Sequence, residues 1–458
     1  MSPISLPFLQ DLSSHDMQMQ CIRDDKSDWI TYAQFQELVS QFSLNFDQPG
    51  RLVFLYITNE IESVAAFLGA LAANQSVAII DPNIKPDRND YLLKSFEPDY
   101  IYDNERGLSR AKNLKKYPSL KQPTILLSTS GSTGSAKFAR LKLTSLETNA
   151  LDIANVTDIV KSDIACAHLP IHYSFGLSVV TSHLIKKSKI RLTTQGFYDA
   201  NFWSLINSDK INFLPGVPYH FKIIERFGFE KAGIDKLSKL AQAGGSLDIP
   251  CRRKAHNFMT SLAGKFFVMY GQTEAGPRIT TLSHEEFDEA PNTVGRALPS
   301  GELHIKNPDP NGLGEILFSG DNVMMSYAHA REHLYLGDIL RGRLNTGDIG
   351  YLDPKRRLTI VGRNNRYAKV CGLRINLDEI QDCLNHYQET AVIEKNEFIK
   401  IYFVTSDPKM TISKNIEIVK TILLREFSIP LASYKFVGID SLPKTSTGKV
   451  DYQSLEDL

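Results

Sequence analysis

Strand-like and helix-like segments alternate along the first two thirds of the chain, and this alternation most constrains the fold. Helix-length stretches show one-sided apolar spacing, as in Phe35, Leu38, Val39 and Phe42. Between the helices, short apolar runs suited to buried strands recur at 52–57, 76–80, 124–128, 165–169, 190–194, 211–214, 240–243 and 266–270. This order predicts an α/β fold in which helices cover both faces of mainly parallel sheets.

The pattern changes after Pro291. Short strands and turns rich in Gly, Pro, Asn and Asp fill residues 291–362, which is typical of a small β-barrel or an antiparallel sheet. The remaining tail has helices predicted at 378–386 and 412–427 and strands predicted at 391–404 and 435–439. We expect two domains, an N-terminal domain over 1–362 and a small α+β domain over 366–458.

Composition limits the classes of partner. Of the 458 residues, 52 are basic and 52 are acidic, so the net charge of +0 gives no reason to expect nucleic acid as a partner. The five cysteines (Cys21, Cys166, Cys251, Cys371 and Cys383) form no CxxC pair, which favours reduced thiols over disulfides or a zinc site. No signal peptide and no apolar stretch long enough to span a bilayer is recognisable. We therefore expect a cytoplasmic protein without membrane insertion.

Residues 127–137 (LSTSGSTGSAK) directly follow a predicted buried strand. Glycines let backbone N–H groups approach phosphates, while hydroxyls and a lysine add donors and positive charge. A flexible linker is the alternative, but a linker seldom lies between a strand and a helix with a lysine at its end. The GK[ST] ending of the Walker P-loop is absent, which argues against an ordinary kinase. The segment therefore predicts a phosphate-binding loop.

Three further segments carry side chains suited to nucleotide chemistry. In 269–276 (MYGQTEAG), Tyr270 offers a flat face for a base and Glu274 a hard oxygen for Mg²⁺; a helix start capped by Thr273 is an alternative that could also coexist. Residues 241–247 (AQAGGSL) end a predicted strand, where ligands bind in such folds, although a glycine pair is more often a plain turn. Asp348, in the NTGD segment, could accept two hydrogen bonds from a ribose diol or simply form a turn.

Lys449 lies in a glycine-containing segment near the C-terminus, residues 442–451 (LPKTSTGKVD). A lysine on a mobile loop can approach an anionic transition state and neutralise it. A solvated surface lysine is the alternative.

Together and in this order, these segments resemble the acyl- and aryl-adenylate-forming (AMP-binding) superfamily, which includes acyl-CoA synthetases, nonribosomal-peptide adenylation domains and luciferase. The resemblance extends from residue 30 to Lys449. It implies a large N-terminal domain of two αβ sheets plus a small β-barrel, with a small mobile α+β C-terminal domain. It also implies that ATP and Mg²⁺ activate a carboxylic acid to acyl-AMP with release of pyrophosphate. The acyl group would then pass to the thiol of coenzyme A or of a carrier protein's phosphopantetheine.

The resemblance also assigns roles to individual residues. Glu274 would hold Mg²⁺ and act in catalysis with Thr273 and Lys449, and Asn365 would be the hinge about which the C-terminal domain turns. His172, Tyr173, Ser174 and Gly244 would line the pocket for the acid. The residues assigned to ATP are Thr129, Ser130, Gly131, Ser132, Thr133, Gly134, Lys137, Gly245, Ser246, Tyr270, Gly271, Asp348 and Arg363.

Three positions depart from the family pattern. The phosphate loop ends in Ala136, Lys137 and Phe138 where Pro-Lys-Gly is usual, the hinge Asn365 is uncharged, and Tyr452 replaces the usual closing arginine. The position of the pivot is therefore left open. Cys371 lies in the segment that the family brings to the site for thiol transfer, and we expect it to be an ordinary buried thiol.

The acid and its acceptor are less constrained. Amino-acid-activating members carry an aspartate that pairs with the substrate ammonium where this chain has His172, so an acyl or aryl acid is favoured. His172 is equally compatible with a structural role. The basic stretch 186–191 (KKSKIR) could contact a nucleotide phosphate or an acidic carrier protein, or form a solvated surface. An amino-acid-activating enzyme and a catalytically inactive nucleotide-binding relative are the alternative functions.

Overall fold

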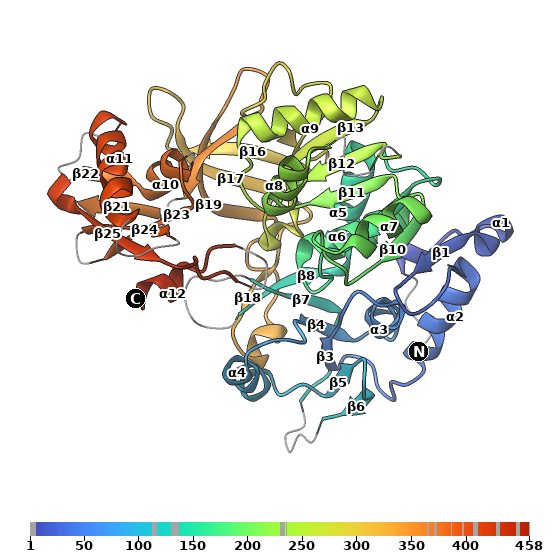
Figure 1. Cartoon of the computed structure of the whole chain (residues 1–458). Helices are drawn as coiled ribbons and strands as arrows, with labels where there is room; N and C mark the ends of the chain where they lie inside the picture. Colours follow the sequence, from blue (N-terminus) through green and yellow to red (C-terminus); the bar gives the residue numbers. More distant parts are fainter. Residues whose placement is uncertain are drawn as a thin grey trace.

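Two large sheets and three smaller ones make up the fold (Figure 1). The computed structural model describes residues 6–111, 117–129, 137–229, 234, 236–363, 366–370, 373–385, 387–395, 398–405, 411–426, 431–445 and 449–457. Statements about structure below refer to these residues.

The larger sheet has nine strands in the order β15-β14-β13-β12-β11-β9-β10-β1-β2. Its centre, from β13 to β1, is parallel, and antiparallel pairs complete both edges. The strands are β1 Gln20–Arg23, β2 Ile30–Thr31, β9 Ile164–Ala167, β10 Lys189–Leu192, β11 Phe213–Gly216, β12 Lys239–Gln242, β13 Lys265–Gly271, β14 Arg278–Leu282 and β15 Arg296–Ala297.

The second sheet has seven strands in the order β18-β8-β7-β4-β3-β5-β6. Strands β5, β3, β4 and β7 are parallel, whereas β6, β8 and β18 pair antiparallel. The strands are β3 Leu52–Tyr56, β4 Ser76–Ile80, β5 Tyr100–Asp103, β6 Gly107–Arg110, β7 Thr124–Ser128, β8 Phe138–Lys142 and β18 Ser326–Ala328.

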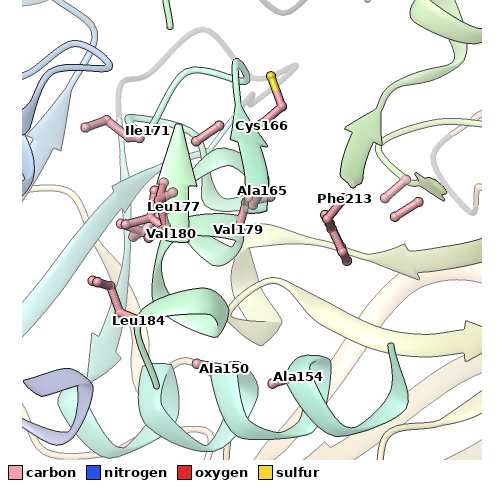
Figure 2. Close-up of a cluster of buried hydrophobic side chains, with 14 of the residues drawn as sticks. Ala150, Ala154, Ala165, Cys166, Ile171, Leu177, Val179, Val180, Leu184 and Phe213 are labelled. Atoms are coloured by element: carbon pink, nitrogen blue, oxygen red, sulfur yellow. The ribbon is translucent and has the colours of Figure 1, made fainter. Parts of the chain in front are cut away.

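Helices fill the space between the two sheets and cover their outer faces. Every residue of α3 except Glu62 is buried, as expected for a helix enclosed on all sides. Figure 2 shows part of this core, to which Ala150 of α5, Leu177 of α6 and Ala165 of β9 all belong. The helices are α1 Ser14–Gln18, α2 Tyr32–Ser43, α3 Ile61–Ala72, α4 Pro86–Phe96, α5 Leu143–Val156, α6 Ser174–Ile185, α7 Ala200–Ser208, α8 Pro218–Phe227 and α9 Ile249–Ser261, with 3-10 turns η1 Pro7–Leu9, η3 Thr273–Ala275 and η4 Arg331–Tyr335.

The turn-rich region forms an antiparallel sheet of four strands, one of the two arrangements expected for it. The hydrogen-bonded order β16-β17-β19-β20 leaves two edge strands, so the pairing gives a sheet rather than a closed barrel. The strands are β16 Gly301–Lys306, β17 Gly314–Gly320, β19 Arg343–Leu352 and β20 Leu358–Arg363. Strand β18, from the same region, instead joins the seven-stranded sheet, where Tyr327 pairs with Ala139. The sequence did not predict this return.

The C-terminal elements, drawn in orange and red in Figure 1, gather on one side of the molecule. Strands β23, β24 and β25 form a three-stranded sheet, and β21 and β22 form a separate pair. The elements are β21 Tyr367–Val370, β22 Leu373–Asn376, α10 Leu377–Asn385, β23 Thr390–Lys395, β24 Phe398–Val404, α11 Thr411–Glu426, η6 Leu431–Ser433, β25 Tyr434–Ile439 and α12 Tyr452–Glu456. This is the α+β arrangement predicted for the tail. None of the described helices combines the length and apolarity needed to cross a bilayer.

Candidate nucleotide and acid site

The ends of β13 and β20 and the middle of β19 bring three of the predicted ATP-binding residues into contact. Tyr270 donates a hydrogen bond from its hydroxyl to Asp348 Oδ2 at 2.5 Å, and Arg363 Nε lies 3.2 Å from Asp348 Oδ1. Asp348 and Arg363 are opposite one another in the register of β19 and β20, so sheet pairing itself places the guanidinium beside the carboxylate. A carboxylate acceptor next to an aromatic ring suits a ribose diol and its base.

Burial controls the ionisation of this cluster. It raises the pKa of the Asp348 carboxyl, while the Arg363 charge and the Tyr270 hydrogen bond act in the opposite direction. Burial, followed by the charge of Asp348, raises the pKa of Tyr270 well above its ordinary value. Tyr270 therefore remains a protonated donor at neutral pH.

Lys449 reaches the same cluster from near the C-terminus. A bridge between Lys444 and Val450 closes a short turn, and the Thr445 amide donates to the Lys449 carbonyl at 2.7 Å. Desolvation and then the Arg363 charge lower the pKa of the Lys449 ammonium, against the opposite effects of Asp348 and Glu274. The ammonium thus lies within electrostatic range of groups far away in the sequence.

A second cluster forms around Glu274. Tyr327 donates a hydrogen bond from its hydroxyl to Glu274 Oε1 at 2.6 Å, and Lys137 Nζ lies 3.7 Å from the centre of the Tyr327 ring. Sequence reasoning missed Tyr327, because β18 lies outside every motif and its pairing with β8 is long-range. Lys137, from the exit of the predicted phosphate loop, therefore lies close to the predicted Mg²⁺ ligand.

Thr273 does not cap a helix, so that alternative is wrong. The 3-10 turn η3 includes Thr273, and the residue before the turn, Gln272, makes no side-chain capping bond. The Thr273 hydroxyl instead lies 3.1 Å from that of Ser174 at the start of α6. This contact joins a predicted catalytic residue to the predicted acid pocket.

The predicted phosphate loop is only partly described. Thr129, directly after β7, is 6% exposed, and its hydroxyl has no hydrogen-bond partner among the described residues. An unpaired buried hydroxyl at the end of a strand is a donor available to a ligand. Outside the described residues lie Ser130, Gly131, Ser132, Thr133, Gly134, the hinge Asn365 and Cys371.

Three of the predicted site glycines lie where a side chain would be strained or crowded. Gly244 has a φ of +84°, and a Cβ on Gly245 would lie 3.2 Å from Pro218 Cγ. A Cβ on Gly271 would lie 1.9 Å from the Pro277 carbonyl oxygen, so only glycine fits there. Ser246 is exposed. These constraints on the glycines hold with or without a nucleotide, so the plain-turn alternative for 241–247 stays open.

His172 lies near a carboxylate that the sequence did not point to. Its Nε2 is 3.7 Å from Asp81 Oδ2, just after β4, and its ring packs against Tyr173 with centres 4.7 Å apart. Burial lowers the pKa of His172, and Asp81 opposes this only partly, so the ring is neutral at neutral pH. Its buried Nδ1 has no hydrogen-bond partner in the part of the chain that the structure describes. The pocket and structural interpretations both remain predictions.

The basic stretch 186–191 is largely used by the fold itself. Arg191 is buried and pairs with Asp209 at 2.7 Å and with Asp25 at 3.0 Å. Lys187 pairs with Asp16 at 3.4 Å. These cations are held by internal partners, which disfavours the proposed contact with a nucleotide phosphate or a carrier protein.

A comparison of the sequence with models of protein families identifies the family that contains these two clusters. The model of the family described as "AMP-binding enzyme" matches residues 13–126 and 102–328, which include β7, β13 and η3. The chain belongs to the AMP-binding enzyme family. The resemblance recognised in the sequence is therefore confirmed, together with the predicted class of enzyme, an AMP-forming ligase of an acid and a thiol.

Relatives and solved structures extend this result. A 2-succinylbenzoate–CoA ligase of Staphylococcus aureus (strain Newman) is 24% identical over 463 residues, which cover 88% of this chain and 90% of the relative. The o-succinylbenzoate CoA synthetase of Bacillus subtilis, bound to its acyl-adenylate, matches with a TM-score of 0.80 at 18% identity over 99% of this chain and 98% of the other. ATP-bound MatB from Rhodopseudomonas palustris matches with a TM-score of 0.79 at 19% identity over 98% of both chains. The predicted fold class is thereby confirmed.

The residues of this AMP-binding enzyme fit ATP and Mg²⁺. The unpaired Thr129 hydroxyl, Lys137 and Lys449 offer donors and charge for phosphates. The described residues contain no group of three His, Cys, Asp or Glu side chains that could hold a metal by themselves. A carboxylate such as Glu274, without two further ligating side chains beside it, suits an ion coordinated mainly by phosphates and water.

Proposed function

We propose that this AMP-binding enzyme activates an acyl or aryl carboxylic acid with ATP and transfers the acyl group to coenzyme A. The observation that carries the proposal is the convergence of Lys449 with Asp348, Arg363 and Glu274, which come from three separate segments. The named ligases among the relatives, which act with coenzyme A, support this acceptor over a carrier protein. ATP and coenzyme A are cytoplasmic metabolites, so we place the reaction there.

In the first step a carboxylate oxygen of the acid attacks the α-phosphorus of ATP, and the bond to the bridging oxygen of pyrophosphate breaks. Tyr270, Asp348 and Arg363 would hold the nucleoside, while Thr129 and Lys137 would hold phosphate oxygens. Bound at Glu274, Mg²⁺ would supply charge neutralisation for the phosphates. Lys449 would stabilise negative charge that develops around the α-phosphate.

In the second step the thiol sulfur attacks the acyl carbon, the bond from that carbon to the AMP oxygen breaks, and the thiol proton passes to solvent. The products are the thioester and AMP. We propose that the C-terminal domain turns between the steps about residue 365, which would move Lys449 away and open a path for the thiol.

The test is the formation of pyrophosphate, AMP and thioester from Mg²⁺-ATP, coenzyme A and a panel of fatty, short-chain, aryl and amino acids. With an accepted acid, Lys449→Ala should lower the rate of pyrophosphate release by about a hundredfold or more. Lys444→Ala is the matched control, because Lys444 lies on the same turn but pairs with Glu389 at 2.9 Å. We expect Lys444→Ala to keep a rate close to wild type.

Three results would contradict the proposal. Failure of every acid to yield AMP would favour the inactive nucleotide-binding alternative, and an undiminished rate in Lys449→Ala would remove the role of that lysine. A clear preference for free α-amino acids would favour the amino-acid-activating alternative. Replacing coenzyme A by a phosphopantetheinylated carrier protein tests the acceptor directly.

A further inference from the structure

We propose that Arg278 forms a subsite for a second anionic group of the acid, so that this enzyme prefers dicarboxylic acids. The inference rests on the proposed function and names its substrate class. It starts from a buried guanidinium for which the protein provides no counter-charge.

Arg278 is unusual among the buried arginines of the chain. It is 2% exposed, its Nε has no hydrogen-bond partner, and the described residues give its guanidinium neither a hydrogen bond nor an ion pair. In contrast, buried Arg140 donates to Ser326 and to two carbonyls, and buried Arg331 pairs with Asp99. An uncompensated buried charge is costly, so its presence favours a partner that comes from outside the chain.

The guanidinium keeps its charge at neutral pH. Burial lowers the pKa of Arg278 to about 9, with no acidic group acting against the effect. The side chain therefore remains mainly protonated at neutral pH and presents a positive charge in a desolvated place. Such a charge attracts an anion and repels the ammonium of an amino acid.

Arg278 lies between the nucleotide cluster and the predicted acid pocket. As the first residue of β14 it pairs with Gly271, next to Tyr270, at a shift in the strand register. Its guanidinium carbon is 4.8 Å from the centre of the Phe175 ring, which adjoins the predicted pocket residue Ser174. A Cβ on Gly244, another predicted pocket residue, would lie 4.0 Å from the same ring.

The backbone of Arg278 is held in place from two sides. Asn149 accepts from the Arg278 amide at 3.2 Å and donates to its carbonyl at 3.0 Å. Asn322 donates to the same carbonyl at 2.8 Å. A fixed backbone beneath an unpaired guanidinium is suited to binding a ligand at a defined position.

A carboxylate is the anion that best fits this arrangement. The planar guanidinium can donate two parallel hydrogen bonds to a carboxylate, and an apolar environment strengthens them. The reacting carboxylate of the substrate must meet the α-phosphate, so the group at Arg278 would be a second one on the same molecule. A phosphate of the nucleotide is the competing anion, and the test separates the two.

The experiment compares two acids that differ by one carboxylate, 2-succinylbenzoate and 4-oxo-4-phenylbutanoate, in the full enzyme with Mg²⁺-ATP. We expect wild type to have a kcat/KM at least fiftyfold higher for the dicarboxylic acid. Arg278→Met should lower that value to about the level of the monocarboxylic acid while changing the latter less than threefold. Arg278→Lys keeps the charge but cannot donate two parallel hydrogen bonds. Its kcat/KM for the dicarboxylic acid should lie between those of wild type and Arg278→Met.

Arg252→Met is the matched control. Arg252 is also buried, but it donates to the carbonyls of Pro291 and Thr293, so its loss should reduce stability without changing the preference between the acids. Arg278→Met should instead raise Tm by a few degrees without acid, because it removes an unpaired buried charge. The dicarboxylic acid should raise Tm of wild type and leave that of Arg278→Met unchanged.

Several outcomes would overturn the subsite. One is that the wild-type enzyme has the same kcat/KM for both acids of this pair and for both acids of the pair succinate and butyrate. Another is that Arg278→Met lowers kcat/KM equally for the dicarboxylic and the monocarboxylic acid, which would place a nucleotide phosphate at Arg278. If no acid yields AMP, the proposed function fails; calorimetric binding of the two acids to wild type and Arg278→Met still decides the subsite. Equal binding by both proteins would refute it.

Discussion

Tyr327 connects two residues that the proposed reaction needs. Its hydroxyl fixes one oxygen of Glu274, and Lys137 rests on its ring. Tyr327→Phe should keep the ring contact but lose the hydrogen bond to a charged group, a loss of about 1.5 kcal/mol or more. We expect pyrophosphate release to fall about tenfold and half-saturation to need more Mg²⁺. Steady-state rates over a Mg²⁺ titration measure both.

Tyr335→Phe serves as the control for that variant. The Tyr335 hydroxyl donates a hydrogen bond to the Pro118 carbonyl at 2.9 Å, away from Glu274. Pyrophosphate release by Tyr335→Phe should therefore depend on Mg²⁺ as it does in wild type. An unchanged Mg²⁺ dependence in Tyr327→Phe would mean that Tyr327 does not orient the carboxylate.

The lowered pKa of Lys449 predicts a pH effect. Only the protonated ammonium can neutralise the reacting phosphate, and Lys449 loses its proton at lower pH than an ordinary lysine. The adenylation rate should therefore fall as pH rises, and it should do so at a lower pH than the ordinary lysine pKa of about 10.4 would give. Pyrophosphate release between pH 7 and 11, with saturating substrates, would show this decline.

Lys449→Arg tests the assignment, because an arginine stays charged over that range. Its rate will be lower than wild type, but the alkaline decline should disappear. If the decline keeps the same midpoint in Lys449→Arg, another group causes it. Circular dichroism at each pH separates the effect from unfolding.

For individual residues, the sequence identified those in local motifs and missed those whose position depends on strands that pair across a long stretch of the chain. Tyr270, Asp348, Arg363 and Lys449 each stand in a short recognisable segment, and the structure brings them together. Tyr327 has no such signal, because only the pairing of β18 with β8 places it beside Glu274. The charge of Arg278 was visible in the sequence, but its burial and lack of a partner were not.

Among the elements, β13 and β14 meet so closely at Gly271 that no side chain fits between them. A Cβ on Gly271 would meet a backbone oxygen, so Gly271→Ala must displace one of the two strands. We expect a loss of at least about 2 kcal/mol in the free energy of unfolding, together with reduced adenylation, because Tyr270 and Arg278 flank this point. Urea denaturation and pyrophosphate release measure the two effects.

Gly196→Ala is the matched control for Gly271→Ala. No atom lies within 4 Å of a Cβ built on Gly196, so its midpoint in urea should change little. A Gly271→Ala variant as stable as Gly196→Ala would show that the strands yield easily.

Periodicity located the buried elements better than the exposed or short ones. The strands at Ser76–Ile80 and Thr124–Ser128 have the predicted bounds, because their ends coincide with a change from apolar to polar residues. The strand predicted at 211–214 lies instead at Phe213–Gly216, where a proline and a glycine concealed its end. The short edge strands β2, β15 and β18 have too few residues to show a period.

For the whole molecule, we propose that the chain divides near residue 363 into two folding units. Each cluster of buried apolar side chains among the described residues draws its members from one side of that point. The contacts that cross it include the Arg363 amide with Asp378 and the Lys444 ammonium near the Tyr219 ring. Polar and aromatic contacts of this kind suit a domain that turns during a reaction.

A fragment of residues 1–363 tests this division. Because its core is complete, we expect cooperative unfolding and binding of ATP, measured by circular dichroism and calorimetry. It lacks Lys449, so its pyrophosphate release should fall by about a hundredfold or more, as in the full-length Lys449→Ala variant. A fragment that fails to fold would show that the C-terminal part is needed for the first unit.

The unpaired charge of Arg278 has a consequence for the lifetime of the protein. Without an anion, the unpaired charge destabilises the native state, and a bound acid would remove this effect. The enzyme without acid should therefore unfold locally more often than the enzyme with acid bound. Proteases in the cell act on opened chains, and a difference of one or two kcal/mol changes the amount of a protein severalfold. The supply of the acid would thus set how much enzyme persists as well as how fast it works.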